Sequence, residues 1–337
     1  MNDSSPVSTP HPAVGRFKPF DLNGLKTYDL QSRPSKVFVE DLGHPVEAHV
    51  GIGDWIDALP RQLAAVEVRR VRDHLCRAYA NRQTVVAALG GHVIKTGCGP
   101  YLIDWIHRGL LSAVVLNGSA AIHDLELAVA GKTSEDVAAQ LPNGRFGMAR
   151  ETADAFAVAA RAGSEQELGL GWALGRHIDA LGCPHADSSL VVAAYRAGIP
   201  CTIHVAIGTD IVHMHPHVSG AALGESTMID FRRLCSVVAT MQNGVWLNLG
   251  SAVILPEVFI KAVSVVHNFG HSLDGLVTVN IDKESNYRSR VNVVDRPATE
   301  GIELIGHHEI LLPLLHAAVA CQLAAADPTP RSQAQAA

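Results

Sequence analysis

The chain has 337 residues, enough for one large α/β domain or two ordinary domains. Apolar residues make up 47% of the sequence and charged residues 18%, which is typical of a globular protein with a sizeable core and excludes a disordered one. The formal net charge of −6 and the lack of a basic block argue against nucleic acid as the main partner.

The two ends of the chain differ in composition from its middle. Residues 1–35 open with a Pro- and Ser-rich stretch and are predicted to form an N-terminal arm, residues 36–325 a single α/β domain, and residues 326–337 a disordered tail. The six cysteines are scattered without a CxxC pair, so reduced thiols in a cytoplasmic protein are expected. Neither a signal core nor an apolar run of membrane-spanning length is apparent, so we expect no membrane partner.

Five apolar runs are predicted to be buried strands, at residues 84–91, 112–120, 199–209, 244–252 and 276–282. Helices are predicted at residues 100–110, 121–131 and 256–270, and residues 36–75 and 133–185 are predicted to be mostly helical. Strands that are apolar throughout are buried on both faces, as in a parallel sheet. Their alternation with helices predicts a doubly wound α/β fold with a mostly parallel sheet.

Four of the predicted strands end in small residues, in the sequences LGG, NGSA, IGT and LGSA. In doubly wound folds, ligands bind at the carboxyl ends of the strands, and small residues there let the backbone or a helix N-terminus approach a phosphate. We therefore expect a cleft for a nucleotide or a similar cofactor, although plain turn glycines would give the same pattern. Neither GxGxxG after the first strand nor GxxxxGK[ST] is present.

Three segments in the same order and spacing resemble deoxyhypusine synthase: residues 90–124, 188–210 and 230–254. The matched features are Gly97, the strand 114–116, Gly118, Asp124, Ile199-Pro200 before a strand, and the glycine-containing strand end of GVWLNLGSAVI. The resemblance implies a Rossmann-like NAD-binding fold and a homotetramer with active sites between subunits. It also implies transferase chemistry, in which a polyamine is oxidised and an aminobutyl group passes through an imine on a lysine.

The chain departs from that family at two positions. Leu255 stands where the family has its catalytic lysine, and Gly198 stands where the family has a substrate-binding histidine. Lys261, six residues further, could substitute for the lysine only if it points into the cleft. The chain thus resembles a bacterial-type relative that lacks the lysine of the hypusine enzyme.

The candidate cofactor-binding residues lie at the matched strand ends and in the helix after the second strand. Backbone groups and Asn or Ser donors there would bind the pyrophosphate and ribose of NAD. Turn glycines, capping residues and a carboxylate favoured by a helix N-terminus are the structural alternatives. The set is Gly90, Gly91, Asn117, Gly118, Ser119, Asp124, Gly208, Gly250 and Ser251.

The candidate catalytic residues are Asp210, His213, His215, Glu257 and Lys261. The histidines titrate near neutral pH and follow a strand end, which favours acid–base chemistry or substrate binding over solvated loop positions. No metal is expected, because the histidines lack cysteine partners and HExxH spacing. Glu257 and Lys261 are four residues apart and would otherwise form an ion pair on one face of a helix.

These observations predict an NAD-dependent enzyme that acts on a small amine or amino-acid-like substrate through an imine. The alternatives are a metal- or histidine-dependent hydrolase or lyase on the same fold, and a non-catalytic nucleotide-binding protein. Arg288, Arg290 and Arg296 would suit an anionic substrate group, and the polar sequence GHHE at residues 306–309 would complete a site. A homo-oligomer, most simply a tetramer, is expected.

Overall fold

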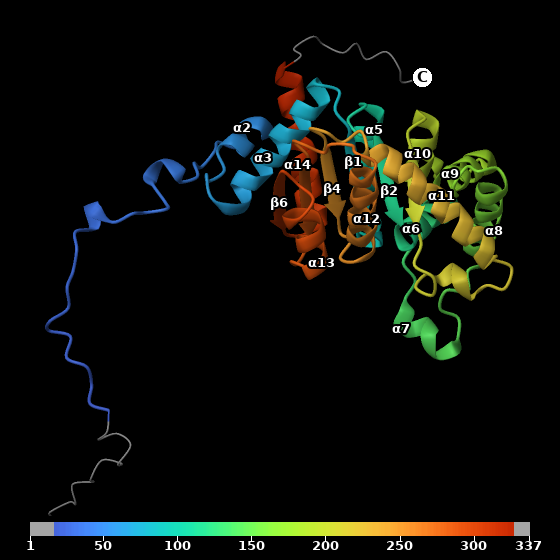
Figure 1. Cartoon of the computed structure of the whole chain (residues 1–337), viewed down its shortest axis with the longest axis horizontal. Helices are drawn as coiled ribbons and strands as arrows, with labels where there is room; N and C mark the ends of the chain where they lie inside the picture. The colour runs from blue at the N-terminus through green and yellow to red at the C-terminus, as the bar shows by residue number, and fades with distance from the viewer. Residues whose placement is uncertain (1–16, 327–337) are drawn as a thin grey trace, which may run out of the picture. The chain divides into compact units, whose positions relative to one another are not determined.

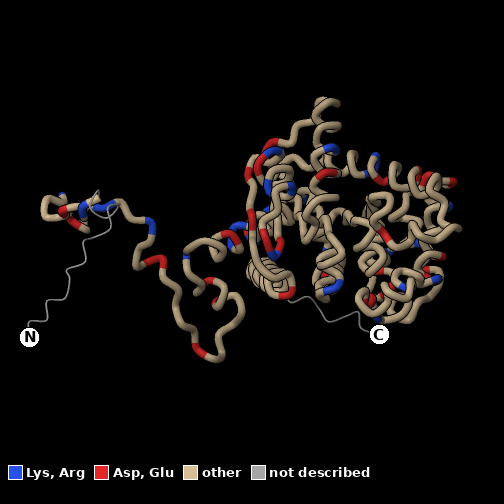
Figure 2. Tube along the Cα trace, turned by 90° about the horizontal axis from the view of Figure 1, so that it is seen from below, with Lys and Arg blue, Asp and Glu red and all other residues tan. Residues whose placement is uncertain are grey.

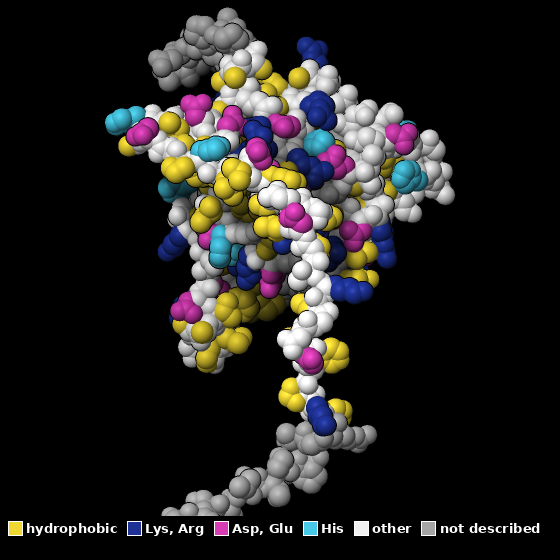
Figure 3. Space-filling view, turned by 90° about the vertical axis from the view of Figure 1, so that its left-hand side faces the viewer, with side chains coloured by type: hydrophobic (Ala, Val, Ile, Leu, Met, Phe, Trp, Pro, Cys, Tyr) yellow, Lys and Arg dark blue, Asp and Glu magenta, His cyan; other side chains and the backbone are white. Residues whose placement is uncertain are grey.

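The computed structural model describes residues 17–326, so the first 16 residues of the predicted arm and nearly all of the predicted tail lie outside the described residues. Two compact units meet in the sequence at Asp41 and Leu42. The first contains two short 3₁₀ helices, η1 (Leu30–Ser32) and η2 (Val39–Asp41). Within residues 17–41 the large apolar side chains are exposed, and Figure 3 shows hydrophobic side chains along this segment.

The second unit is built on six strands that are all parallel: β1 (Val85–Leu89), β2 (Ala113–Asn117), β3 (Cys201–His204), β4 (Val245–Leu249), β5 (Val277–Asp282) and β6 (Glu300–Ile305). Their order in the sheet is β3-β2-β1-β4-β5-β6. The order reverses between β1 and β4, which makes their carboxyl ends the topological switch point of a Rossmann-like sheet. The predicted doubly wound parallel fold is confirmed.

Helices cover both faces of this sheet, because alternate strand residues point to opposite sides. Val85, Ala87 and Leu89 pack in the larger apolar cluster, whereas Val86 and Ala88 pack in the smaller one. The larger cluster is formed with α3 (Leu63–Ala80), α4 (Gly91–Lys95), α5 (Gly99–His107), α6 (Gly118–Ala130), α8 (Arg150–Glu165), α9 (Leu170–Leu181), α10 (Leu190–Ala197) and α14 (His308–Ala326). The smaller one is formed mainly with α11 (Gly220–Val238) and α12 (Ile254–Asn268).

Short elements fill the connections. They are α2 (Ile52–Asp57), α7 (Val137–Gln140), η3 (Leu141–Asn143), η4 (Ala186–Ser188), η5 (Ile211–Met214), α13 (Tyr287–Ser289) and the π-helix η6 (Arg290–Asp295). The helical prediction for residues 36–75 holds only from α2 onward. The predicted third strand ends at His204 and not near Gly208, and β6 was not predicted.

The last helix, α14, is long and apolar enough to cross a membrane by length and composition alone. In the fold it packs on α3 and on α2, with Leu312, Leu315 and Val319 buried. Its apolar composition is therefore accounted for in part by packing within the second unit.

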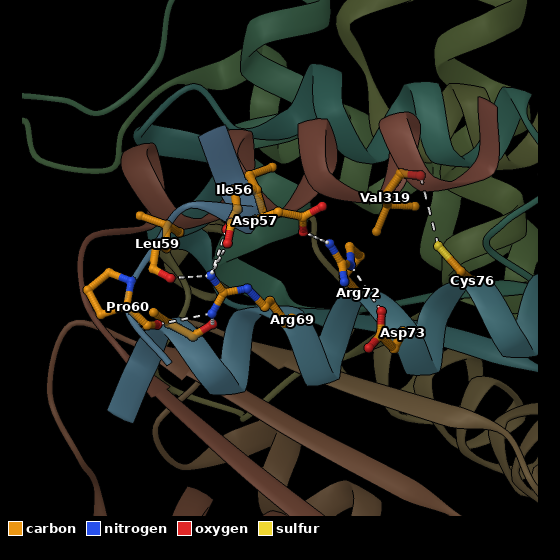
Figure 4. A network of polar contacts seen from close by, with 10 residues as sticks. Ile56, Asp57, Leu59, Pro60, Arg69, Arg72, Asp73, Cys76 and Val319 are labelled. Carbon is orange, nitrogen blue, oxygen red and sulfur yellow. Dashed lines mark hydrogen bonds and ion pairs between the residues drawn. The ribbon is translucent and has the colours of Figure 1, made fainter. Parts of the chain in front are cut away.

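Arg69 of α3 fixes the chain between α2 and α3 (Figure 4). Its guanidinium donates to the carbonyl oxygens of Ile56 at 2.8 Å, Pro60 at 3.0 Å and Asp57 at 3.2 Å. These carbonyls belong to the end of α2 and the following turn, where a helix leaves its last oxygens without partners. One side chain thus closes the turn that positions α2 beside α14.

We expect Arg69→Ala to lower the free energy of unfolding by about 1–3 kcal/mol, because it removes several charge-assisted hydrogen bonds at once. The neighbouring Arg70→Ala is the matched control: Arg70 forms exposed ion pairs with Glu67 and Glu300, which contribute at most about 1 kcal/mol. Urea denaturation of both variants measures the difference. Equal effects would contradict the assigned role of Arg69.

Candidate functional site

The carboxyl ends of all six strands lie along one edge of the sheet, at the lower edge in Figure 1, where α13 lies. Figure 2 views the molecule from this side and shows acidic and basic residues intermixed over its elements. The predicted residues at the ends of β1, β2 and β4 therefore share this edge, together with the loop that follows β3.

Three glycines at this edge provide the space that polar side chains of other segments occupy. A Cβ on Gly91 would lie 2.3 Å from the Oγ of Ser119, and a Cβ on Gly118 would lie 2.0 Å from the Oδ2 of Asp210. Gly250 has a φ of 62°, and its Cβ would lie 3.0 Å from the ring of His308. Each glycine thus lets a polar group lie directly on a strand end.

Gly90 has a different neighbour at the switch point. A Cβ there would lie 2.0 Å from the carbonyl oxygen of Gly250, and the Gly90 amide donates to the carbonyl of Leu249 at 2.9 Å. Only glycine permits this approach of the backbone after β1 to the backbone after β4. The sequence LGG is therefore required by packing between strand ends, whether or not a ligand binds above it.

Asp210 and His213 form a pair in the turn after β3. The Nδ1 of His213 accepts hydrogen bonds from the amides of Gly208 at 3.1 Å and Asp210 at 3.3 Å. The neutral ring must then carry its proton on Nε2. That nitrogen lies 4.0 Å from the Oδ2 of Asp210, which is too long for a hydrogen bond.

Burial changes the titration of both members of this pair. It raises the pKa of Asp210 to about 6, against a hydrogen bond from Thr209 that acts in the opposite direction. It lowers the pKa of His213 below its ordinary value. Near neutral pH the pair therefore consists of a neutral imidazole donor and a carboxylate that takes up a proton in mildly acidic solution. A substrate hydroxyl or amine could accept from the first and donate to the second.

Polar atoms that are buried without a partner gather at this edge. Within residues 17–326 there are six such side-chain atoms, and four of them belong to Asp210, His213, Asn248 and His308. The Nε2 of His308 donates to the carbonyl of Ile281 at 3.1 Å, which leaves Nδ1 as an acceptor. An unsatisfied buried polar atom is costly, so such a concentration points to groups that a ligand completes.

Asn248 was not among the predicted site residues, and His308 was predicted only as part of the polar sequence GHHE. Asn248 is the fourth residue of β4, and its amide nitrogen donates to the carbonyl of Ser251 at 3.0 Å and to Asn280 at 2.8 Å. A polar residue inside an apolar strand was the available signal for Asn248. His308 lies in the polar sequence GHHE, but its place at the edge follows from β6.

His215 has a structural partner. Its Nε2 bonds the carbonyl oxygen of Gly147 at 2.9 Å and so ties the turn after β3 to the loop before α8. The two predicted histidines therefore differ, because only His213 has a buried nitrogen without a partner.

Several predicted cofactor residues also have structural roles. Asn117 caps α6 through a 2.8 Å bond from the Ala120 amide. Asp124 is buried and accepts from the hydroxyl of Ser189 and the amides of Leu190 and Val191, so it caps α10. These bonds account for the burial of Asp124 without a ligand.

Gly208 and Ser251 lie on either side of the edge. Gly208 has a φ of 92° in the exposed turn beside His213. Ser251 is buried, and its hydroxyl accepts from the Leu255 amide at 3.2 Å at the start of α12. Gly208 thus permits the turn after β3, and Ser251 stabilises the start of α12.

Glu257 and Lys261 form an ion pair, which is the alternative that their spacing allowed. Glu257 also pairs with Arg288 and accepts from Asn292 at 2.9 Å. Leu255, at the position of the resembled family's lysine, is fully buried in the smaller apolar cluster. A lysine nucleophile is therefore absent from that position, and Lys261 is exposed.

Two further carboxylates of α11, those of Asp230 and Glu225, have separate partners. Asp230 is buried and accepts from the amides of Gly171 at 2.8 Å and Ile203 at 2.9 Å. Glu225 pairs with Arg232 on the exposed side of α11. Residues 17–326 contain no group of three His, Cys, Asp or Glu side chains arranged to hold a metal ion.

Comparison with known proteins gives matches at the level of structure. No family model matches the chain, and no curated protein matches its sequence. Unliganded AgrE superposes with a TM-score of 0.54 at 16% identity, over 78% of this chain and 34% of AgrE. The ternary complex of AgrE with ornithine and NAD⁺ gives 0.52 at 16% identity, over 77% of this chain and 33% of AgrE.

A conserved LOR/SDH protein from Methanococcus maripaludis S2 superposes with a TM-score of 0.50 at 15% identity, over 77% of this chain and 71% of that protein. The chain thus spans about a third of the length of AgrE. These likenesses show the fold alone. Membership of the deoxyhypusine synthase family stays a prediction.

The raised pKa of Asp210 predicts how the free energy of unfolding depends on pH. Below its ordinary value of 3.8, folded and unfolded chains both hold the proton. As the pH rises toward about 6, the unfolded chain loses the proton first, so the free energy of unfolding falls and then levels off above the folded pKa. We expect Asp210→Asn to be more stable than the native chain above about pH 6, by on the order of 2 kcal/mol. The difference should shrink toward about pH 4, and denaturation at several pH values measures it. A less stable variant at about pH 8 would contradict the assignment.

Proposed function

We propose that this protein is an NAD-dependent enzyme that oxidises a small amine or amino-acid-like substrate at the carboxyl edge of its sheet. The observation that carries the proposal is the Asp210–His213 pair, whose facing buried atoms have no partner, in the turn after β3 of a 3-2-1-4-5-6 parallel sheet. Ligands of this fold class bind at that edge. AgrE, which shares the fold, binds ornithine and NAD⁺.

The residues at the switch point fit a dinucleotide. The backbone after β1 meets the backbone after β4 at Gly90 and Gly250, and next to them His308 and Asn248 each keep a buried acceptor without a partner. Ribose hydroxyls and a carboxamide are donors that such acceptors would bind. Ser119 lies against Gly91 at the start of α4 and adds a hydroxyl. When bound, the dinucleotide NAD⁺ would supply the acceptor for a hydride from the substrate carbon.

The chain's own part in the reaction is the movement of a proton. The substrate ammonium would lose one proton to the Asp210 carboxylate, whose pKa of about 6 keeps it ionised yet basic near neutral pH. The N–H on the Nε2 of His213 would hold the substrate in position. Loss of a hydride from the adjacent carbon then leaves an iminium, which water hydrolyses to a carbonyl and ammonium. No lysine is used, since Leu255 is buried and Lys261 is paired.

Substitution of His213 and of His215 should have different effects on turnover. We expect His213→Gln to lower turnover roughly 10²–10⁴-fold, because it removes the positioned donor of the pair. His215→Gln should leave turnover within a few-fold and lower thermal stability, because its bond to the Gly147 carbonyl is structural. NADH formation with a panel of amino acids and diamines, beginning with L-ornithine, measures turnover. A larger loss of turnover in the His215 variant would argue against the proposed pair.

The proposed NAD site can be tested by introducing one negative charge at the carboxyl edge of the sheet. Ser119→Asp adds a carboxylate beside Gly91 and should weaken NAD binding at least tenfold by repulsion of the pyrophosphate. Ser272→Asp is the matched control, because Ser272 is exposed in the turn before β5, at the opposite edge of the sheet. Calorimetric titration with NAD⁺ measures both affinities. Equal affinities in the two folded variants would refute the assigned NAD site, and NAD⁺ binding without turnover of any amine would favour a non-catalytic binding protein.

A further inference from the structure

A cavity of about 500 Å³ lies between α12, α13 and the π-helix η6. Its charged and polar lining includes Glu257, Lys261, Arg288, Asn292 and Arg296. Since α12 follows β4 and α13 follows β5, Glu257 and Arg288 lie just beyond the carboxyl ends of these two strands. The cavity therefore borders the same edge of the sheet as the proposed site.

The charges around this cavity are unequal. Three cations, Lys261, Arg288 and Arg296, face a single carboxylate, Glu257. Hydrogen bonds from Lys261 and Arg288 lower the pKa of Glu257, so this carboxylate stays ionised. Among the residues that line the cavity, cationic side chains thus outnumber carboxylates.

Arg296 is positioned by the π-helix η6, an uncommon type of secondary structure. Asn292 is buried in the π-helix, donates to Glu257 at 2.9 Å, and accepts from the Nη1 of Arg296 at 3.0 Å. The hydroxyl of Thr278 on β5 donates to the carbonyl of Val293 at 2.6 Å and so anchors the π-helix to the sheet. π-helices are uncommon and frequently occur at functional sites. This one presents Asn292 and Arg296 to the cavity in a fixed arrangement.

We propose that this cavity binds a small anion, a carboxylate or a phosphate, through Arg288, Arg296 and Lys261. Guanidinium groups bind both anions in bidentate fashion. In the free protein Glu257 takes the place of that anion, and it gives up Arg288 and Lys261 when the anion enters. This anion site is separate from the Asp210–His213 pair, because β2 and β1 lie between β3 and β4 in the sheet.

The test compares ligands that carry an anionic group with one that does not. L-Ornithine, its decarboxylated counterpart putrescine and inorganic phosphate are titrated calorimetrically into the native chain, with NAD⁺ titrated separately. We expect ornithine or phosphate to bind, and putrescine at least tenfold more weakly than ornithine. Preference for ornithine identifies a carboxylate site, and preference for phosphate identifies a phosphate site. Binding of putrescine as tightly as ornithine, or of no anion, overturns the inference.

Variants locate the site. Arg296→Ala should weaken anion binding at least tenfold, whereas Arg290→Ala, an exposed neighbour that faces Asp295 and does not line the cavity, should leave it unchanged. Glu257→Gln should tighten anion binding several-fold, because it removes the competing carboxylate. This gain cannot arise from misfolding. Unchanged affinity in both the Arg296 and Glu257 variants overturns the inference. Retained anion binding without NAD⁺ binding overturns the proposed function alone.

Discussion

The carboxyl edge of the sheet depends on one steric constraint: side chains with polar atoms lie where a Cβ would otherwise be. Ser119 lies against Gly91, Asp210 against Gly118 and His308 against Gly250, all within 3.0 Å of where a Cβ would stand. The same arrangement recurs away from the edge, where Asp230 lies against Gly169. Because protein interiors are close-packed, an alanine at any of these positions must displace a polar group and the segment that carries it. The glycines thus determine which titratable groups reach the strand ends.

Three buried aspartates show why titration alone does not identify the site. Burial raises the pKa of Asp124 and Asp210 to about 6 and that of Asp230 to about 7. The carboxylates of Asp124 and Asp230 accept from backbone amides and hold helices and strands together. Asp210 alone among the three keeps a buried oxygen without a partner. Hydrogen-bond partners, and not the size of the shift, distinguish a structural carboxylate from one available for chemistry.

The sequence predicted the parallel sheet well because five strands lie in mostly apolar runs, which are typical of strands buried on both faces. It missed β6, whose buried Ile302 and Leu304 alternate with Glu303 and an exposed Ile305, as expected of an edge strand. It predicted that most of the candidate residues share one edge of the sheet, because parallel strands end together. It could not separate His213 from His215, or recognise Asp124 as the cap of α10, because those roles depend on Gly147 and on residues 189–191, far along the chain.

The packing of α3 against α14 has a consequence for the order of events during synthesis. Val68, Val71 and Leu75 of α3 are buried in the larger cluster, and α3 makes its main helix contacts with α14, which begins only at His308. The central strand β1 likewise has to wait for β4. At roughly 5–20 residues per second, α3 leaves the ribosome about ten to fifty seconds before its partner. During that interval its apolar stripe lacks its folded partner, and exposed apolar surface of this kind is prone to aggregation.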